Sequence, residues 1–577
     1  MLFERRAESV GPRPMIVKMV LVSALVLGIV LPFGASCRRG GESPEAGGVG
    51  EKAEPAVEER VVRITGAFPL YPDPGVGLDF VECAALGNLY DTLVFPTLDG
   101  QIEPHLATDW QVSSDGLKYT FNLRRGVKFH DGSELEAEDI VFSMHRLITM
   151  GEGFGYLFED VVESARATDK YTVEFKLKKP FGPFVSALVR LYVLNKDLVM
   201  QHLERPGQYG EFGDYGKKWL LTNDAGSGPY RILEVKLEEY LLAERFEDYW
   251  EGWEESAPEY VKFLGSCEPV TVRTLMARRE LEITDEWQPA ENVRAMDGIE
   301  GVDVAYLPNG SICNIMLNTK KPPTDDVHFR KALAYCLDYD VTVDKIYPGS
   351  KRSNGPVASM YPGHNPNLVP YERNLDIARV ELKKSKYYQH LDKYPVTMSW
   401  CAEVPDEEKI ALLLQANAAE LGIKVEVLKT PYVTICANVQ NPETTAHGTI
   451  LFQGDSYPDA GSVLKTRYHS STCGTTSQCE WLQDPEIDRL IEKALATPDQ
   501  AARFKTYHEI QEKLVNLCPT IWLFEQAEMR AYQAAYLSWP AADYAKDGRL
   551  LCPTVGRMLY AREMKVFPER RVGPAGE

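Results

Sequence analysis

Cysteine is the residue type in this chain whose chemistry depends most on its neighbours. Eleven cysteines occur, and Cys473 and Cys479 flank a short loop rich in Ser, Thr and Gly (CGTTSQC). In an oxidising compartment this spacing predicts a disulfide between the two. Metal binding is the alternative, but no neighbouring Cys or His completes a zinc pattern. No metal site is therefore predicted in this loop.

Motifs that mark the common enzyme classes do not occur in the sequence. There is no nucleophile-elbow serine with matching His and Asp, no phosphate-binding P-loop and no HExxH helix. An envelope hydrolase that uses one of the Cys residues or one of the ten scattered His residues is the enzyme class that remains. The sequence favours a protein that performs no chemistry and holds no cofactor.

The N-terminal stretch predicts export from the cytoplasm. Four basic residues precede an apolar run over residues 19–33, which is 15 residues long. A bilayer-spanning helix needs about 20 residues, so we expect residues 1–36 to be a signal peptide. Small residues lead directly into Cys37, as in the lipobox of bacterial lipoproteins, although Gly34 stands where Leu is usual. We expect a lipid on Cys37; an ordinary cleaved signal with an incidental cysteine is the alternative.

Composition limits what the rest of the chain can be. Residues 37–60 hold the lipidated Cys37 and then a stretch without aromatic residues, which predicts a flexible tether. The 577 residues carry a formal charge of −21, with 44% hydrophobic and 25% charged residues. The length allows roughly two to four folded domains. The negative charge repels phosphate backbones and so argues against nucleic acid as a partner.

Strand-like and helix-like patterns alternate from Val61 onward, which predicts a mixed α/β fold. Strands are expected at residues 61–64, 119–123, 172–177 and 424–428, and helices at 326–337, 376–385, 407–421 and 485–496. In the last helix, Ile487, Leu490, Ile491 and Ala494 share one face. Pro485 suits its first turn, and Asp484 is the expected N-cap.

Several segments, in this order along the chain, resemble the family 5 extracellular solute-binding proteins of ABC transporters, the oligopeptide- and dipeptide-binding type. The strongest is residues 104–143 (PHLATDWQVSSDGLKYTFNLRRGVKFHDGSELEAEDIVFS). Further matches are GSGPY at 226–230, FRKALAY at 329–335 and DPEID at 484–488. The resemblance covers about Val61 to Tyr532.

The resemblance implies a two-lobe, three-domain periplasmic-binding-protein fold with the ligand cleft between the lobes. Domain I would comprise residues 61–95, 193–305 and 525–577, with domain II at 96–192 and domain III at 306–524.

The resemblance also points to ligand-binding residues in domain III. In peptide-binding relatives, an Asp in a Gly-Asp segment after a domain III strand pairs with the ligand's ammonium group, and Gly454-Asp455 resembles that segment. A turn-capping role for Asp455 is the alternative, and Asp459 is expected to hold the loop. The further candidates are Tyr457 beside Asp455, Ser311 and Asn314 in the segment that enters domain III, and Trp400 at the end of a strand.

The implied protein is a lipid-anchored, periplasmic or extracytoplasmic binding protein of an ABC importer. It would act as a monomer that captures a small-molecule or peptide ligand, with peptides favoured, and delivers it to the membrane permease subunits. A receptor for another solute is the alternative within the same class: an oligosaccharide, a metal chelate or haem, since some relatives carry nickel complexes or haem.

Overall fold

The computed structural model describes residues 60–66, 72–77, 80–265, 268–286, 288–549, 551–571 and 573. Residues 59–577 form one compact unit. The predicted signal peptide, Cys37 and the tether up to residue 59 lie outside the described residues. No helix in the described part combines the length and apolar character that a bilayer crossing needs.

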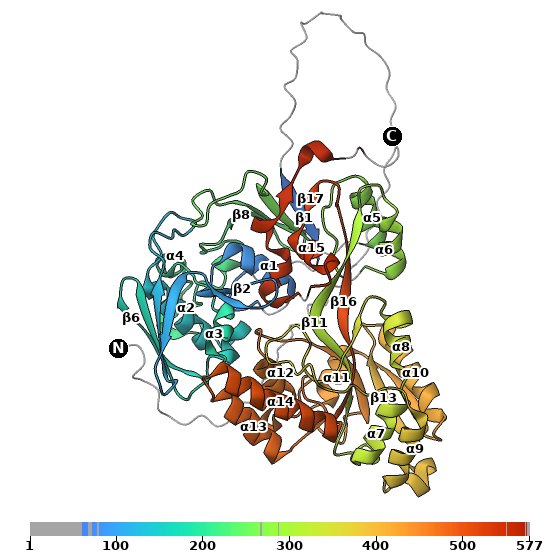
Figure 1. Ribbon diagram of the computed structural model, residues 1–577. Coiled ribbons are helices and arrows are strands. Elements are labelled where there is room, and N and C mark those ends of the chain that lie inside the picture. The colour runs from blue at the N-terminus through green and yellow to red at the C-terminus, as the bar shows by residue number, and fades with distance from the viewer. Residues whose placement is uncertain are drawn as a thin grey trace, which may run out of the picture. The chain divides into compact units, whose positions relative to one another are not determined.

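Three sheets organise the described chain (Figure 1). The first has the strand order β1-β10-β9-β8 and pairs β1 with β10 in parallel: β1 (Val61–Thr65), β10 (Tyr260–Leu264), β9 (Tyr240–Arg245) and β8 (Tyr230–Lys236). The second is antiparallel: β4 (Ala107–Val112), β5 (Lys118–Leu123), β7 (Thr172–Leu177) and β6 (Val162–Asp169). Short pairs are formed by β2 (Val94–Pro96) with β3 (Ile102–Pro104), and by β17 (Leu537–Ser538) with β18 (Lys565–Val566).

The third sheet has six strands in the order β12-β16-β11-β15-β13-β14. Their bounds are β12 (Lys351–Arg352), β16 (Thr520–Tyr532), β11 (Asp303–Leu317), β15 (Gly448–Gln453), β13 (Val396–Cys401) and β14 (Val425–Thr430). The long strands β11 and β16 run antiparallel, from the pair Asp303–Tyr532 to the pair Met316–Thr520. They lie side by side through the middle of Figure 1. Bridges from Ile283 to Ile64 and to Tyr532 join the first sheet to β16.

Helices cover these sheets. Those before β11 are α1 (Phe80–Leu89), α2 (Ala137–Met150), α3 (Phe184–Ala187), α4 (Lys196–Gln201), α5 (Pro269–Ala277) and α6 (Ala290–Asp297). Those after it are α7 (Val327–Cys336), α8 (Tyr339–Val341), α9 (Leu375–Lys384), α10 (Asp406–Ala419), α11 (Tyr432–Asn438), α12 (Ala460–Tyr468), α13 (Pro485–Leu495), α14 (Gln500–Leu517) and α15 (Pro540–Lys546). One large cluster of buried apolar side chains packs on the first two sheets, and another packs on the six-stranded sheet.

The strongly patterned elements were predicted within two residues of their observed bounds. In α13 the four apolar residues of the expected face are all buried, and the Asp484 carboxylate accepts hydrogen bonds from the N–H groups of Glu486 and Ile487. The predicted boundaries between the three domains are not tested by this unit. The described contacts keep residues 59–577 in one unit, so those boundaries stay a prediction.

Candidate functional site

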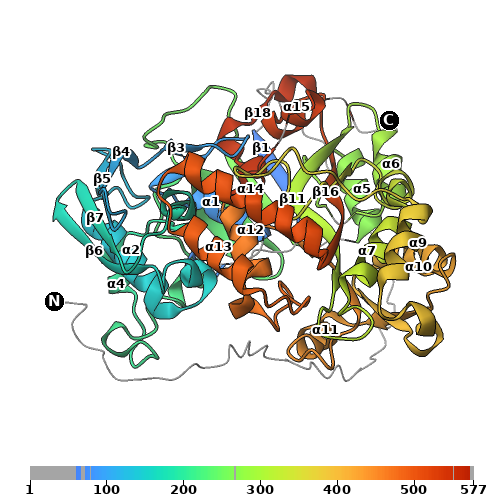
Figure 2. The same ribbon diagram turned by 60° about the horizontal axis from the view of Figure 1, so that its bottom comes forward.

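The predicted ammonium-binding segment is the loop that joins β15 to α12. β15 lies inside the six-stranded sheet between β11 and β13, so its neighbours fix where the strand ends. At the far end of the loop, the Asp459 carboxylate caps α12 by accepting from the N–H of Gly461 at 2.8 Å. Asp459 also forms a buried ion pair with Arg503 of α14, with 3.2 Å from Oδ2 to Nη2. Asp459 therefore holds the loop against α12 and α14, which lie beside α13 (Figure 2).

Asp455 lies in the middle of this loop, and its carboxylate has no hydrogen-bond partner among the residues that the structure describes. Both oxygens are shielded from solvent, and neither accepts a hydrogen bond from the residues that the structure describes. Burial raises the pKa of Asp455 well above its usual range, while the Arg467 charge opposes that rise and Asp459 adds to it. An ionised carboxylate left in such a place costs several kcal/mol unless a cation pairs with it. The site therefore suits a cationic group such as an ammonium.

Residues from a distant stretch of the chain cover the neighbouring Ser456. The Tyr156 hydroxyl lies 2.6 Å from Ser456 Oγ. The Arg190 guanidinium donates from Nε to the Ser456 carbonyl at 2.6 Å and from Nη1 to the Cys83 sulfur at 2.9 Å. These contacts join residues 156–190 directly to the Asp455 loop.

A second set of contacts joins the same two parts of the molecule. The Phe181 and Tyr457 rings meet edge to face with 6.3 Å between centroids. Gly182, the residue after Phe181, donates its backbone N–H to the carbonyl of Leu495, the last residue of α13, over a distance of 2.6 Å. A Cβ at Gly182 would lie 2.2 Å from the Thr497 carbonyl oxygen, so only glycine permits this approach. The structure thus has residues 156–190 closed onto the Asp455 loop and the end of α13.

The charge of Asp455 acts on buried tyrosine side chains in its neighbourhood. Burial is the main cause that raises the pKa of Tyr361 and Tyr457, and the Asp455 charge contributes to both shifts. The phenols are therefore un-ionised hydrogen-bonding groups at neutral pH. The Tyr192 hydroxyl is also buried, and it lacks a hydrogen-bond partner in the described part of the chain. Uncharged hydroxyls of this kind fit a ligand that carries polar groups as well as a cation.

The structure brings some of the predicted site residues together. Gly454 is exposed, and a Cβ built on it would lie 3.3 Å from Ser311 Oγ, so β11 and the loop meet there. Tyr457 is buried next to Asp455. Asn314 is fully buried on β11 opposite Leu451 of β15; its Nδ2 donates to the Ile312 carbonyl, and its Oδ1 has no described partner.

Trp400 lies elsewhere. It is 2% exposed within the core cluster of the six-stranded sheet, and no described hydrogen bond or ring contact joins it to the Asp455 loop. Trp400 is thus packed as a core residue of this sheet.

The predicted disulfide between Cys473 and Cys479 is wrong for this structure, because both are free cysteines. The Cys473 thiol donates to the Leu482 carbonyl at 3.4 Å, whereas the Cys479 thiol is buried 3.6 Å from the Met316 sulfur. The loop between them turns at Gly474, whose φ is +85°. The sequence spacing gave no information on the direction of either thiol.

A Ser, a His and an Asp do meet in the fold, but not as a catalytic triad. Asp91 accepts from His105 Nε2 at 2.9 Å and from the Ser227 hydroxyl at 2.9 Å. Both groups thus bind the Asp91 carboxylate. A nucleophile and its base must be hydrogen-bonded to each other, and no described hydrogen bond joins His105 to Ser227. Among the described residues, no group of three or more His, Cys, Asp or Glu side chains is arranged to hold a metal ion.

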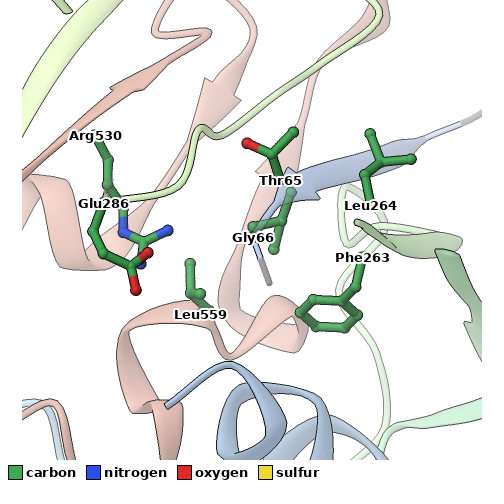
Figure 3. Close-up of a pocket in the computed structure, with 8 residues that line it drawn as sticks. Thr65, Gly66, Phe263, Leu264, Glu286, Arg530 and Leu559 are labelled. Carbon is green, nitrogen blue, oxygen red and sulfur yellow. The ribbon is translucent and has the colours of Figure 1, made fainter. Parts of the chain in front are cut away.

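A small pocket lies away from Asp455, where β1 and β10 end near β16 (Figure 3). Arg530 and Glu286 line one side and form an ion pair of 2.7 Å, and Phe263 and Leu559 supply apolar walls. Arg530 also pairs with Glu528 at 2.7 Å. Its charge is therefore compensated within the protein, in contrast to that of Asp455.

Sequence reasoning missed Tyr156, Arg190 and Arg467 as neighbours of the site. The first two lie 300 and 266 positions before Ser456, so no local pattern could place them. Arg467 follows Asp455 by twelve positions on α12, and it could have been noticed as a basic residue just after the Gly-Asp segment.

The model of the bacterial extracellular solute-binding proteins, family 5 (middle part), matches residues 101–475. The chain belongs to this family, and the predicted fold class is confirmed. It is accordingly an extracytoplasmic binding protein.

Curated relatives and solved structures extend over most of the chain. The probable D,D-dipeptide-binding periplasmic protein DdpA of Escherichia coli is 26% identical over 470 residues, which are 80% of this chain and 87% of the relative. Heme-binding protein A of Haemophilus influenzae is 24% identical, covering 82% of this chain and 88% of the relative. The solved structure of the periplasmic binding protein DppA from Helicobacter pylori, in complex with the peptide STSA, has a TM-score of 0.68 and 23% identity, covering 88% of this chain and 98% of that one.

Proposed function

We propose that this protein captures peptides outside the cytoplasm and delivers them to the permease of an ABC importer, with Asp455 pairing with the peptide's α-ammonium. The single observation that carries the proposal is the buried Asp455 carboxylate, which accepts no hydrogen bond within the described part of the chain. Relatives named as dipeptide-binding proteins, and a neighbour solved with a peptide, support the same ligand class. The contacts of Tyr156 and Arg190 with Ser456 support a site that is enclosed at this loop.

The test is a double-mutant cycle between Asp455 and the peptide's amino group. Asp455→Asn removes the charge with little change in shape. Removing one partner of a buried pair typically costs about 3–5 kcal/mol, so peptide affinity is expected to fall roughly 10²–10⁴-fold. N-acetylated peptides should bind the wild type poorly and respond much less to the substitution. Calorimetric titration gives the four affinities, and a coupling energy near zero would show that Asp455 does not bind the ammonium.

Mass spectrometry of ligands that copurify with the full chain identifies the solute without any assumption. Peptides or other amines are expected. An oligosaccharide, a haem or a metal chelate without an amino group would overturn the peptide proposal while leaving the protein a binding protein.

We also propose that the mature protein is a monomer anchored by a lipid on Cys37. The support is the apolar run of residues 19–33, the small residues before Cys37 and the polar stretch after it. Cys37→Ser should move the protein from the membrane fraction to the soluble envelope fraction. Unchanged membrane association of that variant would show that the anchor lies elsewhere.

A further inference from the structure

Cys83 and Arg190 form a buried contact that the proposed function does not use. Cys83 is the fourth residue of α1 and is 3% exposed. The Arg190 guanidinium, which is 5% exposed, donates from Nη1 to the Cys83 sulfur at 2.9 Å. Arginine carries donors and no acceptor, so the sulfur accepts this hydrogen bond, and a thiolate is a stronger acceptor than a thiol. The geometry therefore favours the ionised form of Cys83.

The described polar contacts of Arg190 include no carboxylate. Its second hydrogen bond goes from Nε to the Ser456 carbonyl at 2.6 Å, and its Cζ lies 4.1 Å from the centre of the Phe154 ring. A carbonyl and a ring face stabilise a cation in part, but neither carries a negative charge. The Cys83 sulfur is therefore the group in contact with Arg190 that can become its counter-ion.

Arg146 shows how another buried arginine in this part of the molecule is neutralised. It is 1% exposed, and its Nη1 and Nη2 donate to the two carboxylate oxygens of Asp73, each at 2.6 Å. Burying a guanidinium without an anion is costly, so a partner of this kind is the usual arrangement. Cys83 stands beside Arg190 where Asp73 stands beside Arg146.

The position of Cys83 in α1 stabilises a negative charge on the sulfur as well. The first turn of a helix carries the positive end of its dipole, and thiols there ionise more readily. The other titratable groups that act on the pair of Cys83 and Arg190 are the phenols of Tyr156 and Tyr192. Tyr156 is 50% exposed and Tyr192 is buried, and a phenol is uncharged at neutral pH. Arg190 is therefore the charge that decides the ionisation of Cys83.

Tyr192 gives independent evidence that the space beside Cys83 takes a group from outside. It is 2% exposed, and its hydroxyl has no hydrogen-bond partner in the described part of the chain. Burial is the main cause that raises the pKa of Tyr192, and the Cys83 charge is the next, so the phenol lies close to the sulfur. Buried hydroxyls are almost always hydrogen-bonded. The Tyr192 hydroxyl is thus available to a polar group next to Cys83.

We propose that Cys83 is a reactive thiolate, held by Arg190, that forms a mixed disulfide with a small polar disulfide compound. The compound enters when residues 156–190 separate from the Asp455 loop. The Cys83 sulfur attacks one sulfur of the compound and forms a new S–S bond, while the original S–S bond breaks and its electron pair leaves on the second sulfur as a thiolate. Cys83 is oxidised and the compound is reduced. This modification site does not use Asp455, so it stands or falls independently of the proposed peptide binding.

The experiment measures how fast dithiodipyridine, a small disulfide, modifies Cys83 at different pH values in the full chain freed of copurified ligand. Timed quenching and mass spectrometry of the cysteine-containing peptides give the rate at each position. An ordinary thiol reaches half of its maximal rate near about pH 8.5, whereas Cys83 should do so at least about one pH unit lower. Cys83 that stays unmodified, or that has its midpoint at or above the ordinary value, would overturn the inference.

Two variants at Arg190 separate the effect of its charge from the effect of its packing. Arg190→Gln removes the charge and should raise the midpoint of the Cys83 reaction by at least about one pH unit. Arg190→Lys keeps a positive charge and should leave the midpoint low. An unchanged midpoint in Arg190→Gln would overturn the inference. An equal rise in both variants would assign the effect to lost packing and would overturn it as well.

Cys552 is the control within the same protein. It is buried, its thiol donates to the Thr554 hydroxyl at 3.1 Å, and burial is the main cause that raises its pKa. At pH 6.5 Cys552 should therefore react at least about fivefold more slowly than Cys83. Equal rates would show that opening merely exposes both sulfurs and would overturn the inference. Dithiothreitol should release the adduct from Cys83, and an adduct that resists it would exclude a mixed disulfide.

Discussion

Two aspartates four positions apart in one loop differ in the partners that the fold provides for their carboxylates. Asp459 has an arginine and a backbone N–H as partners, and it fixes the start of α12. The two carboxylate oxygens of Asp455 are also shielded from solvent, yet they have no described hydrogen-bond partner. Burial raises the pKa of both carboxyls, and Arg503 opposes that effect at Asp459. The comparison teaches that burial of a charge does not by itself separate a structural residue from a binding residue, whereas the inventory of its partners does.

Asp459→Asn should produce the largest change in stability. The substitution leaves the buried Arg503 guanidinium without its carboxylate, which typically costs about 3–5 kcal/mol. Urea unfolding of the empty protein measures the loss. A cost below about 1 kcal/mol would mean that the ion pair contributes little and that the contrast with Asp455 is weaker than the contacts indicate.

Asp455→Asn should have the opposite sign in the same assay. Because the pKa of Asp455 is raised in the folded state, the wild type loses stability as the pH rises above the unfolded-state value near 3.9. The variant lacks this titration, so at pH 8 the empty variant should be more stable by about 1–3 kcal/mol. The gain should shrink on acidification to pH 4. A loss of stability at every pH would instead support the turn-capping role of Asp455.

Glu407 is intermediate between the two aspartates in the number of partners that its buried carboxylate has. It is 1% exposed on α10, and its carboxylate accepts one hydrogen bond, from the Cys401 N–H at 2.7 Å. Burial raises its pKa to about 8, so the folded state holds a proton that the unfolded state releases near pH 4.5. Wild-type stability should therefore fall by about 1 kcal/mol between pH 6 and pH 7 from this group. Glu407→Gln should remove that part of the slope in parallel urea titrations; an unchanged slope would assign it to other groups.

Tyr156→Phe should give the smallest effect. It deletes the hydroxyl that lies 2.6 Å from Ser456 Oγ and so weakens closure over Asp455. A hydrogen bond contributes about 0.5–1.5 kcal/mol net, so ligand affinity should fall roughly 2- to 10-fold. Tyr388→Phe is the matched control, because this partly exposed tyrosine has no described hydrogen bond from its hydroxyl. Equal affinities in all three proteins would exclude a role for the Tyr156 contact.

Local patterns predicted the elements well, whereas the ligand-binding residues stay a prediction. The periodic apolar face and N-cap of α13 are properties of eleven neighbouring residues, so the sequence specifies them directly. Gly454-Asp455 was found because the resemblance marks a segment of consecutive residues. The missing partner of Asp455 could not be predicted, because it depends on where Arg467 and Arg503 come to lie in three dimensions. The same holds for Tyr156 and Arg190, and for the thiols of Cys473 and Cys479, whose directions a loop sequence does not determine.

The pairing of β11 with β16 has a consequence for how the chain is made. Asp303 pairs with Tyr532, so during synthesis β11 leaves the ribosome long before its neighbour exists. Its other neighbour, β15, also appears only at residue 448. Until then β11 presents an open strand edge over residues 303–317, the kind of surface that pairs with other chains. Long-range strand pairing of this type is slow to form. The nascent chain therefore most needs protection from aggregation in the period that ends when Thr520 emerges.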